Sequence, residues 1–137
     1  LGGGYGIDIS GSTITVEGTI FRHISDKALS VGEQSHMTAR NVTIENAVTG
    51  AVSKDNSTLY LYDSTFINSR LAAIMAYVKK PEFGPSSIVA ENVTIRGDRP
   101  GAKVQHGSRI VLNGQDIQSE PLDVDRLYET VMKKGKN

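Results

Sequence analysis

The 137-residue sequence has no cysteine, no excess of either charge and no long apolar run. Without cysteine the chain can form no disulfide and use no thiolate chemistry, although its compartment stays open. Fifteen basic and fifteen acidic residues balance, whereas a nucleic-acid-binding face needs a clustered excess of lysine and arginine. No stretch of about 18 apolar residues is present. We therefore expect neither nucleic-acid binding nor membrane insertion.

Helical periodicity is also missing until the last part of the chain. In its place, short apolar runs of period two are separated by Gly, Asn, Asp or Ser, which is typical of short strands joined by tight turns. Four positions of these runs recur together, in steps of 23, 22, 29 and 22 residues. The columns are Ile14, Met37, Leu59, Ile88 and Ile110; Val16, Ala39, Leu61, Ala90 and Leu112; Gly18, Asn41, Asp63, Asn92 and Gly114; and Phe21, Ile44, Phe66, Ile95 and Ile117.

A fifth column consists of pairs in which a small residue precedes an apolar one, although the last pair begins with lysine. Its members are Gly6-Ile7, Ala28-Leu29, Ala51-Val52, Ala73-Ile74 and Lys103-Val104. A repeat of about 22 residues with three short strands leaves no room for crossover helices. Equivalent positions become neighbours only if the chain coils and stacks strand upon strand. The sequence therefore predicts an all-β parallel β-helix of about five coils of 22 or 23 residues.

The third column, which contains Gly18, Asn41, Asp63, Asn92 and Gly114, is predicted to form a corner of each coil. It holds Gly, Asn or Asp, the residues that adopt positive φ at least cost, and it begins the strings Asn-Val-Thr-Ile at 41–44 and 92–95 and Asp-Ser-Thr-Phe at 63–66. These strings resemble the right-handed parallel β-helix repeats of the pectate-lyase-like superfamily. That superfamily includes polysaccharide lyases, hydrolases and epimerases as well as non-catalytic domains of surface and periplasmic proteins, so the resemblance implies a fold and leaves activity open.

Three segments are predicted. Residues 1–5 form a flexible glycine-rich entry, residues 6–118 the β-helix, and residues 119–137 a capping helix with a basic tail. In the last segment, Val124, Leu127, Tyr128 and Val131 follow helical spacing, so we expect an amphipathic lid on the final coil. Because no cap precedes the first coil at Gly6, we also expect that the chain is part of a larger protein.

One repeat is longer than the others by seven residues, at 77–85, and insertions in solenoids often carry binding sites. Its side chains suit hydrogen bonding to and stacking on a sugar; the alternative is a tolerated loop that covers neighbouring side chains. The predicted binding residues are Tyr77, Lys79, Lys80, Glu82 and Phe83 of this insert, together with Tyr60 and Tyr62.

Two further columns are predicted to point outward, since side chains alternate along a strand. The first holds Thr15, Thr38, Tyr60, Val89 and Val111, and the second Glu17, Arg40, Tyr62, Glu91 and Asn113. The apolar members Tyr60, Val89 and Val111 predict a contact with an upstream domain or a second copy of the chain; the alternative is a set of scattered exposed strand-forming residues. The side chains of the second column suit two roles equally well, which are pairing with one another across strands and forming a surface that binds a sugar.

No catalytic constellation emerges from the sequence. Lyases and epimerases need a base with cations or a metal, and hydrolases need two carboxylates on one face. The acids share no such face, and His23, His36 and His106 occupy different places in the repeat, so we expect no metal and no cofactor.

The resulting hypothesis is a non-catalytic β-helix domain that presents a rigid face for carbohydrate or protein binding. The alternative is a lyase or epimerase acting on an acidic polysaccharide near Lys79, Lys80 and Glu82. The resemblance implies an extracellular, periplasmic or cell-surface setting.

Overall fold

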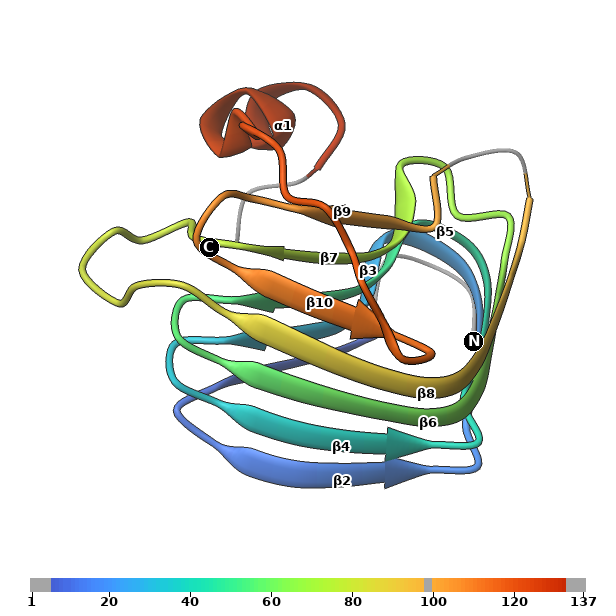
Figure 1. Cartoon of the computed structure of the whole chain (residues 1–137). Helices are drawn as coiled ribbons and strands as arrows, with labels where there is room; N and C mark the ends of the chain where they lie inside the picture. The colour runs from blue at the N-terminus through green and yellow to red at the C-terminus, as the bar shows by residue number, and fades with distance from the viewer. Residues whose placement is uncertain (1–5, 98–99, 133–137) are drawn as a thin grey trace.

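The protein is a stack of coils in which each turn of the chain lies on the preceding one (Figure 1). The computed structural model describes residues 6–97 and 100–132. Five strands form the front of the stack: β2 (Thr13–Glu17), β4 (His36–Arg40), the first half of β6 (Thr58–Ile67), the first half of β8 (Ser87–Arg96) and β10 (Arg109–Leu112). The rear contains β1 (Ile7–Ser10), the later parts of β3 (Ile20–Gly32) and β5 (Thr43–Lys54), β7 (Ala72–Tyr77) and β9 (Ala102–Val104). The predicted parallel β-helix is confirmed.

The long strands bend round a corner, and their remaining halves make a third side. There Phe21, Ile44, Phe66 and Ile95 lie in register, as the sequence predicts. On the front, Met37 pairs with Leu59 and Leu59 with Ile88. Met37, Leu59, Ile88 and Ile110 are all completely buried. A continuous apolar row thus runs up the inside of the stack, and no single coil could bury it alone.

The corner after the front strands needs left-handed backbone. Gly18, Asn41, Asp63 and Asn92 have φ of 62°, 53°, 54° and 56°. The side chains of neighbouring coils also bond there, since Asn92 Nδ2 donates to Asp63 Oδ1 at 2.7 Å. Gly, Asn and Asp therefore recur in this column because the backbone turns there with positive φ.

The opposite corner carries a serine ladder that the sequence prediction did not include. It consists of Ser12, Ser35, Ser57, Ser86 and Ser108. The backbone N–H of each of the first four donates to the hydroxyl of the serine one coil further on, at 3.0 to 3.3 Å. Four of the five are buried, so the ladder satisfies backbone donors that water cannot reach.

The last coil differs from the prediction. Asn113 and Gly114 both have positive φ, 50° and 82°, and the chain reverses into β11 (Gln115–Asp116), which pairs antiparallel with β10. Ile117 N donates to Ile110 O, so placing Ile117 above Ile95 is wrong. A two-residue Asn-Gly turn favours a hairpin over another front strand, so the front of the stack ends with β10. Beyond the hairpin, Glu120 still pairs in parallel with Gln105 of the coil below.

The register of the rear strands also corrects the fifth column. Ile7 pairs with Leu29, Leu29 with Ala51, and Ala51 with Ile74. The fifth column aligns Ala51 with Ala28, which is wrong by one residue, because Ala51 pairs with Leu29. The column also aligns Lys103-Val104 with Ala73-Ile74, which is wrong because Ile74 pairs with Ala102. An extra residue in β3, between Ile24 and Lys27, shifts the register there, as expected of a β-bulge.

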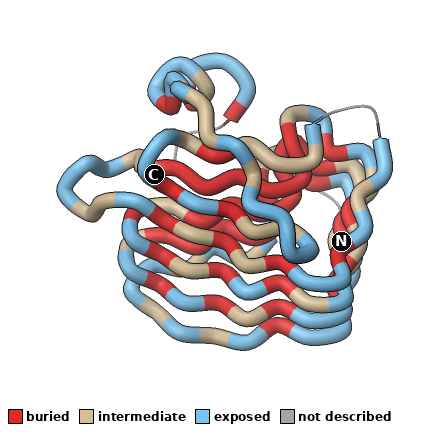
Figure 2. Tube along the Cα trace, in the orientation of Figure 1, coloured by how far each residue is buried: buried red, intermediate tan, exposed pale blue. Residues whose placement is uncertain are grey.

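A helix, α1 (Val124–Thr130), covers part of the rear sheet. Asp123 caps it, accepting a hydrogen bond from Arg126 N at 3.1 Å, and Val124 and Tyr128 pack on the outer side of β5 and β7 with Val52, Met75 and Tyr77. The predicted amphipathic helix is present, but Val131 is 48% exposed and Met132 is buried in its place. Figure 2 shows the consequence, because β7 beneath this helix is buried along its whole length whereas the front strands alternate.

Candidate functional site

The outward side chains of β2, β4, β6, β8 and β10 form a regular surface, here called the front platform. Thr15, Thr38, Tyr60, Val89 and Val111 lie in one row in register across all five strands. The period-two prediction for this row is confirmed. Tyr60 is its most exposed large apolar side chain, at 38%, while Val89 and Val111 are half-buried.

The second row of the front platform combines charge with an aromatic ring. Glu17, Arg40, Tyr62 and Glu91 are in register from β2 to β8. The guanidinium carbon of Arg40 lies 4.4 Å from the centre of the Tyr62 ring. This distance is typical of a cation–π contact, which holds the Arg40 guanidinium against the Tyr62 ring.

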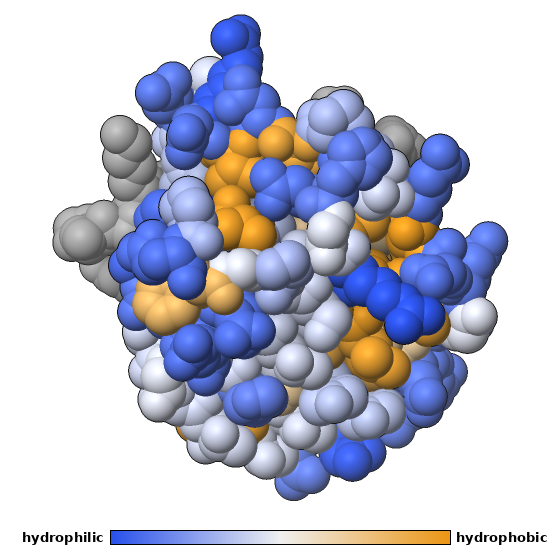
Figure 3. Space-filling view, turned by 60° about the vertical axis from the view of Figure 1, so that its left-hand side comes forward, coloured by the Kyte–Doolittle hydropathy of each residue, from blue (hydrophilic) through white to orange (hydrophobic). Residues whose placement is uncertain are grey.

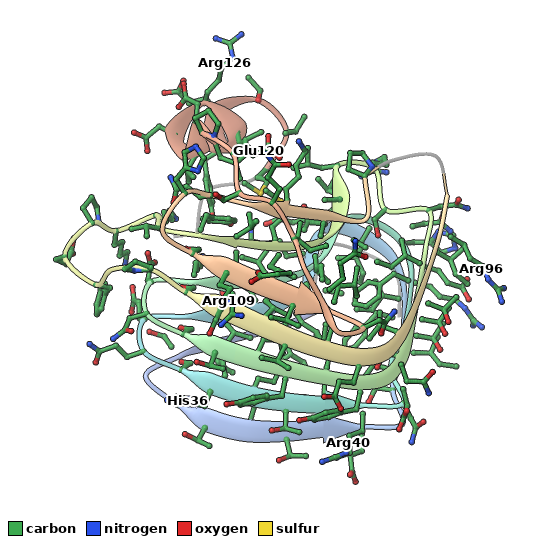
Figure 4. All side chains as sticks on the ribbon, viewed as in Figure 1. His36, Arg40, Arg96, Arg109, Glu120 and Arg126 are labelled. Atoms are coloured by element: carbon green, nitrogen blue, oxygen red, sulfur yellow. The ribbon has the colours of Figure 1, made fainter. Side chains whose placement is uncertain are left out.

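A third row begins the front strands and is polar. His36 pairs with Thr58, Thr58 with Ser87, and Ser87 with Arg109. Figure 4 shows His36 at the start of β4, Arg40 at its end and Arg109 at the start of β10. Arg109 is bound to Asp116 of the terminal hairpin at 3.1 Å. The platform therefore presents hydrogen-bonding groups on both sides of Tyr60.

The insert at 77–85 projects from the corner between β7 and β8 (Figure 1). Asp55 anchors its beginning, because Oδ1 accepts from the backbone N–H groups of Lys79 and Lys80, each at 2.8 Å. Lys80 forms an ion pair with Glu33. The hydrogen bond between them lowers the pKa of Glu33 and raises the pKa of Lys80. Glu82 at the tip is exposed and Phe83 is half-buried.

Two of the binding residues predicted in the insert, Tyr77 and Lys79, do not lie on the exposed surface of the insert. Tyr77 is completely buried, so it has no surface on which a sugar could stack. Lys79 turns back onto the rear side, where its Nζ lies 4.5 Å from the centre of the Tyr128 ring. The predicted binding residues thus divide into three groups: Tyr60 and Tyr62 on the front platform, Lys80, Glu82 and Phe83 on the insert, and Tyr77 and Lys79 at the rear.

The rear group is part of a lysine–tyrosine cluster, made of Lys27, Lys54, Lys79, Tyr77 and Tyr128. The ammonium groups of Lys27 and Lys54 lie 5.1 and 5.7 Å from the centre of the Tyr128 ring. The hydroxyl oxygens of Tyr77 and Tyr128 are 2.6 Å apart, and Lys54 Nζ donates to Tyr128 Oη at 3.4 Å. Three cations from different strands and loops therefore surround one ring.

Burial has the largest effect on the proton affinities in this cluster. It lowers the pKa of Lys54 to about 8, and the ammonium groups of Lys27 and Lys79 act in the same direction. It also lowers the pKa of Lys79 and raises the pKa values of both tyrosine hydroxyls. At neutral pH the tyrosines remain protonated while Lys54 is partly neutral.

Sequence reasoning missed this cluster for an identifiable reason. Lys27 follows the bulge in β3, Lys54 ends β5 and Tyr128 comes from the helix, so no common spacing connects them. Helical spacing predicts that Tyr128 lies on the apolar face of the helix, which is correct, but the contacts of its hydroxyl depend on what the helix covers.

The described part of the chain contains no group of three His, Cys, Asp or Glu side chains arranged to hold a metal ion. Within the same residues, no helix has the length and apolarity needed to cross a bilayer. The surface in Figure 3 shows apolar areas separated by polar ones, not one continuous apolar face.

A family model described as a right handed beta helix region matches residues 2–123, most of the chain. No curated protein and no solved structure gives a match.

Proposed function

The chain belongs to the right-handed β-helix family, and from this premise we propose that it is a recognition domain that binds an extended carbohydrate chain on the front platform. The observation that carries the proposal is the register of the outward side chains, which lie one coil apart in the first row across five strands and in the second across four. Strands in a stack are about 4.8 Å apart. The evenly spaced side chains of the front platform could therefore contact successive units of a polymer that has a regular repeat.

Tyr60 supplies the stacking surface in this proposal. It lies in the middle strand of the five and is 38% exposed. Aromatic rings combine a large apolar face with a polar hydroxyl, which suits the alternating faces of a sugar ring. Because Tyr60 sits on a strand and not on a loop, little conformational entropy is lost when a ligand orders it.

Arg40 supplies polar recognition beside it. Its guanidinium is held against Tyr62 at 4.4 Å, and Arg40 has no ion pair among the described residues. Its donors are oriented in advance for the hydroxyl or carboxylate oxygens of a sugar. Arg40 is the group of this row that would pair with the carboxylate of an acidic polysaccharide, such as one containing uronates, although Glu17 and Glu91 lie in the same row.

The contacts that Lys79 and Lys80 make within the protein favour a binding function over lyase or epimerase chemistry. That chemistry would use Lys79, Lys80 and Glu82 as base and cations. Lys80 is paired with Glu33, and Lys79 is directed to the Tyr128 ring on the rear side. The two lysines of the insert are engaged within the protein and do not converge on the front platform. The extracellular or envelope setting of the proposal is supported by the pectate-lyase-like resemblance alone.

The experiment is a polysaccharide binding array with the purified chain, run beside an absorbance assay for unsaturated uronate. We expect binding to an acidic polysaccharide without product. Tyr60→Ala and Arg40→Ala should each weaken that binding about tenfold, as expected when a stacking or charge-assisted contact of roughly 1.4 kcal/mol is lost.

Arg126→Ala is the matched control for Arg40→Ala, because Arg126 is an exposed arginine on α1, away from the front platform (Figure 4). It should bind like the parent. Binding that is insensitive to both front-platform variants would place the site elsewhere. Formation of unsaturated uronate would overturn the non-catalytic assignment.

A further inference from the structure

The lysine–tyrosine cluster lies on the rear sheet beneath α1, so its function is independent of the front platform and of the carbohydrate proposal. Lys27 has a carboxylate partner, Asp26, at 3.0 Å. Among the described residues, Lys54 and Lys79 have no ion pair. The cluster thus holds two amines close together whose charges are not directly neutralised.

Lys54 is the best placed of these amines for chemistry. It leaves the end of β5, and its Cε lies 3.0 Å from the point that a Cβ on Gly32 of the neighbouring coil would occupy. A side chain at position 32 would therefore crowd the path that Lys54 takes along the sheet. Lys54 is half-buried, so solvent reaches part of it. The glycine lets the amine lie close to the sheet and reach Tyr128.

The charges that face Lys54 come from several neighbouring elements, and Glu33 after β3 is one of them. Lys27 on β3 and Lys79 after β7 disfavour its protonation, whereas Asp8 on β1 and Asp55 after β5 favour it. Burial outweighs the two carboxylates and lowers its pKa to about 8. At pH 7.5 an ordinary lysine is almost entirely protonated, whereas a lysine with this pKa is neutral in a substantial fraction of the molecules. Only the neutral amine has the lone pair of a nucleophile.

The Tyr128 hydroxyl lies close enough to the Lys54 amine to transfer protons to and from a group bound there. It accepts from Lys54 Nζ at 3.4 Å and is bound to the Tyr77 hydroxyl at 2.6 Å. Burial raises its pKa, so the hydroxyl is protonated at neutral pH. A nucleophile and an acid with its own hydrogen-bond partner are thus within reach of each other.

We propose that Lys54 is the nucleophile of an aldehyde-binding site, in which its amine condenses with the carbonyl group to form an imine and the Tyr128 hydroxyl transfers the protons. The nitrogen lone pair forms the C–N bond while the carbonyl π electrons move to oxygen. A proton moves from nitrogen to that oxygen, giving a carbinolamine. Tyr128 then donates its proton to the departing hydroxyl, which leaves as water.

The iminium formed at that point returns a proton to the Tyr128 phenolate, and the neutral imine remains. Amine and aldehyde have become imine and water, and the tyrosine is regenerated. The ammonium groups of Lys27 and Lys79 lie 5.1 and 4.5 Å from the ring centre, so positive charge lies beside the ring of the transient phenolate. Lys79, which has no ion pair among the described residues, favours an aldehyde that carries a carboxylate.

Glyoxylate with sodium cyanoborohydride is the probe, because reduction converts the imine into a stable carboxymethyl-lysine that peptide mass spectrometry locates. On the intact chain, over pH 6 to 10, we expect Lys54 to be modified at least about tenfold faster than Lys103 near pH 7.5. Lys103 is the internal control, since it is half-buried like Lys54 but ion-paired with Glu120 at 3.6 Å. Equal rates at Lys54 and Lys103 across the pH range would overturn the proposal.

The variant Tyr128→Phe tests the role of the hydroxyl while keeping the ring against which the lysines lie. We expect slower modification of Lys54, with circular dichroism unchanged in shape. An unchanged Lys54 rate in a folded Tyr128→Phe protein would remove Tyr128 from the mechanism. Lys54→Arg keeps the positive charge and should abolish the selective product without increasing modification at Lys27 or Lys79; a transfer of the signal to either lysine would assign the nucleophile to that residue and overturn the proposal.

Discussion

The hydroxyl oxygens of Tyr77 and Tyr128 lie 2.6 Å apart, although 51 residues separate them in the sequence. The two rings meet edge to face, with centres 6.0 Å apart. Tyr77 belongs to the rear sheet and Tyr128 to α1, so this pair joins the C-terminal helix to the stack. It also gives the hydroxyl of the completely buried Tyr77 a hydrogen-bond partner.

The first prediction concerns this pair. Tyr128→Phe leaves the buried Tyr77 hydroxyl with only the sulfur of Met132, at 3.8 Å, so we expect a loss of about 1–3 kcal/mol in the free energy of unfolding. Tyr77→Phe should also destabilise. The double variant should lose less than the sum, since no hydroxyl is then left unpaired. Urea denaturation of the parent, the two single variants and the double variant measures the coupling free energy between the two hydroxyls. Strictly additive losses would mean that the hydroxyls do not interact.

A second prediction tests the coil register. Leu59 is completely buried between Met37 and Ile88, so Leu59→Asp places an unpaired charge in the apolar row. The penalty exceeds about 5 kcal/mol, comparable to the whole stability of a small domain. We expect no cooperative thermal transition by circular dichroism. Lys79→Ala is expected to keep stability within about 1 kcal/mol, and a parent-like melt for Leu59→Asp would refute the register.

A third prediction concerns the close contact between Gly50 and Phe66. A Cβ at position 50 would come within 2.3 Å of Cδ2 of the Phe66 ring and 2.6 Å of Ala73 O. Gly50→Ala should therefore destabilise by about 1–3 kcal/mol through overpacking. Combining it with Phe66→Leu should recover part of the loss. If Gly50→Ala melts at the parent temperature, the ring does not occupy this space in solution.

A fourth prediction follows from the lowered pKa of Lys54. Between about pH 8 and the ordinary lysine value near 10.4, the unfolded chain binds a proton that the folded chain does not, so stability rises with pH. Lys79, whose pKa is also lowered, acts in the same direction. The raised pKa values of Tyr77 and Tyr128 reverse the trend above about pH 10, where the unfolded tyrosines lose their protons first.

Urea unfolding from pH 7.5 to 9.5 measures this effect before the tyrosines contribute. We expect a gain of about 1 kcal/mol in the free energy of unfolding, after allowance for the screening of a half-buried amine. Lys54→Met should flatten the profile and raise stability at pH 7.5. A slope that survives in Lys54→Met would have to come from another group, and a flat parent profile would mean that Lys54 has an ordinary pKa.

Two features that the prediction lacks do have a signal in the sequence. Ser12, Ser35, Ser57, Ser86 and Ser108 follow the same steps as the apolar columns, and the adjacent Asn113 and Gly114 are a strong hairpin signal. Asn113 also takes over contacts that a further coil would make, since its side chain bonds to both Val93 N and Val93 O. Ile117 has the spacing and residue type of the fourth column, so the repeat pattern predicts one coil position that the hairpin replaces.

The sequence by itself determined the coil, its register on the front and the corner between its strands. Those features depend on residue type at a fixed step, since an apolar residue must face inward and a left-handed turn needs Gly, Asn or Asp. Tertiary structure alone decided that Tyr77 is buried and that Lys27, Lys54 and Lys79 surround Tyr128. Such contacts depend on which face the C-terminal helix covers, and packing between elements with no common period leaves no pattern in the chain.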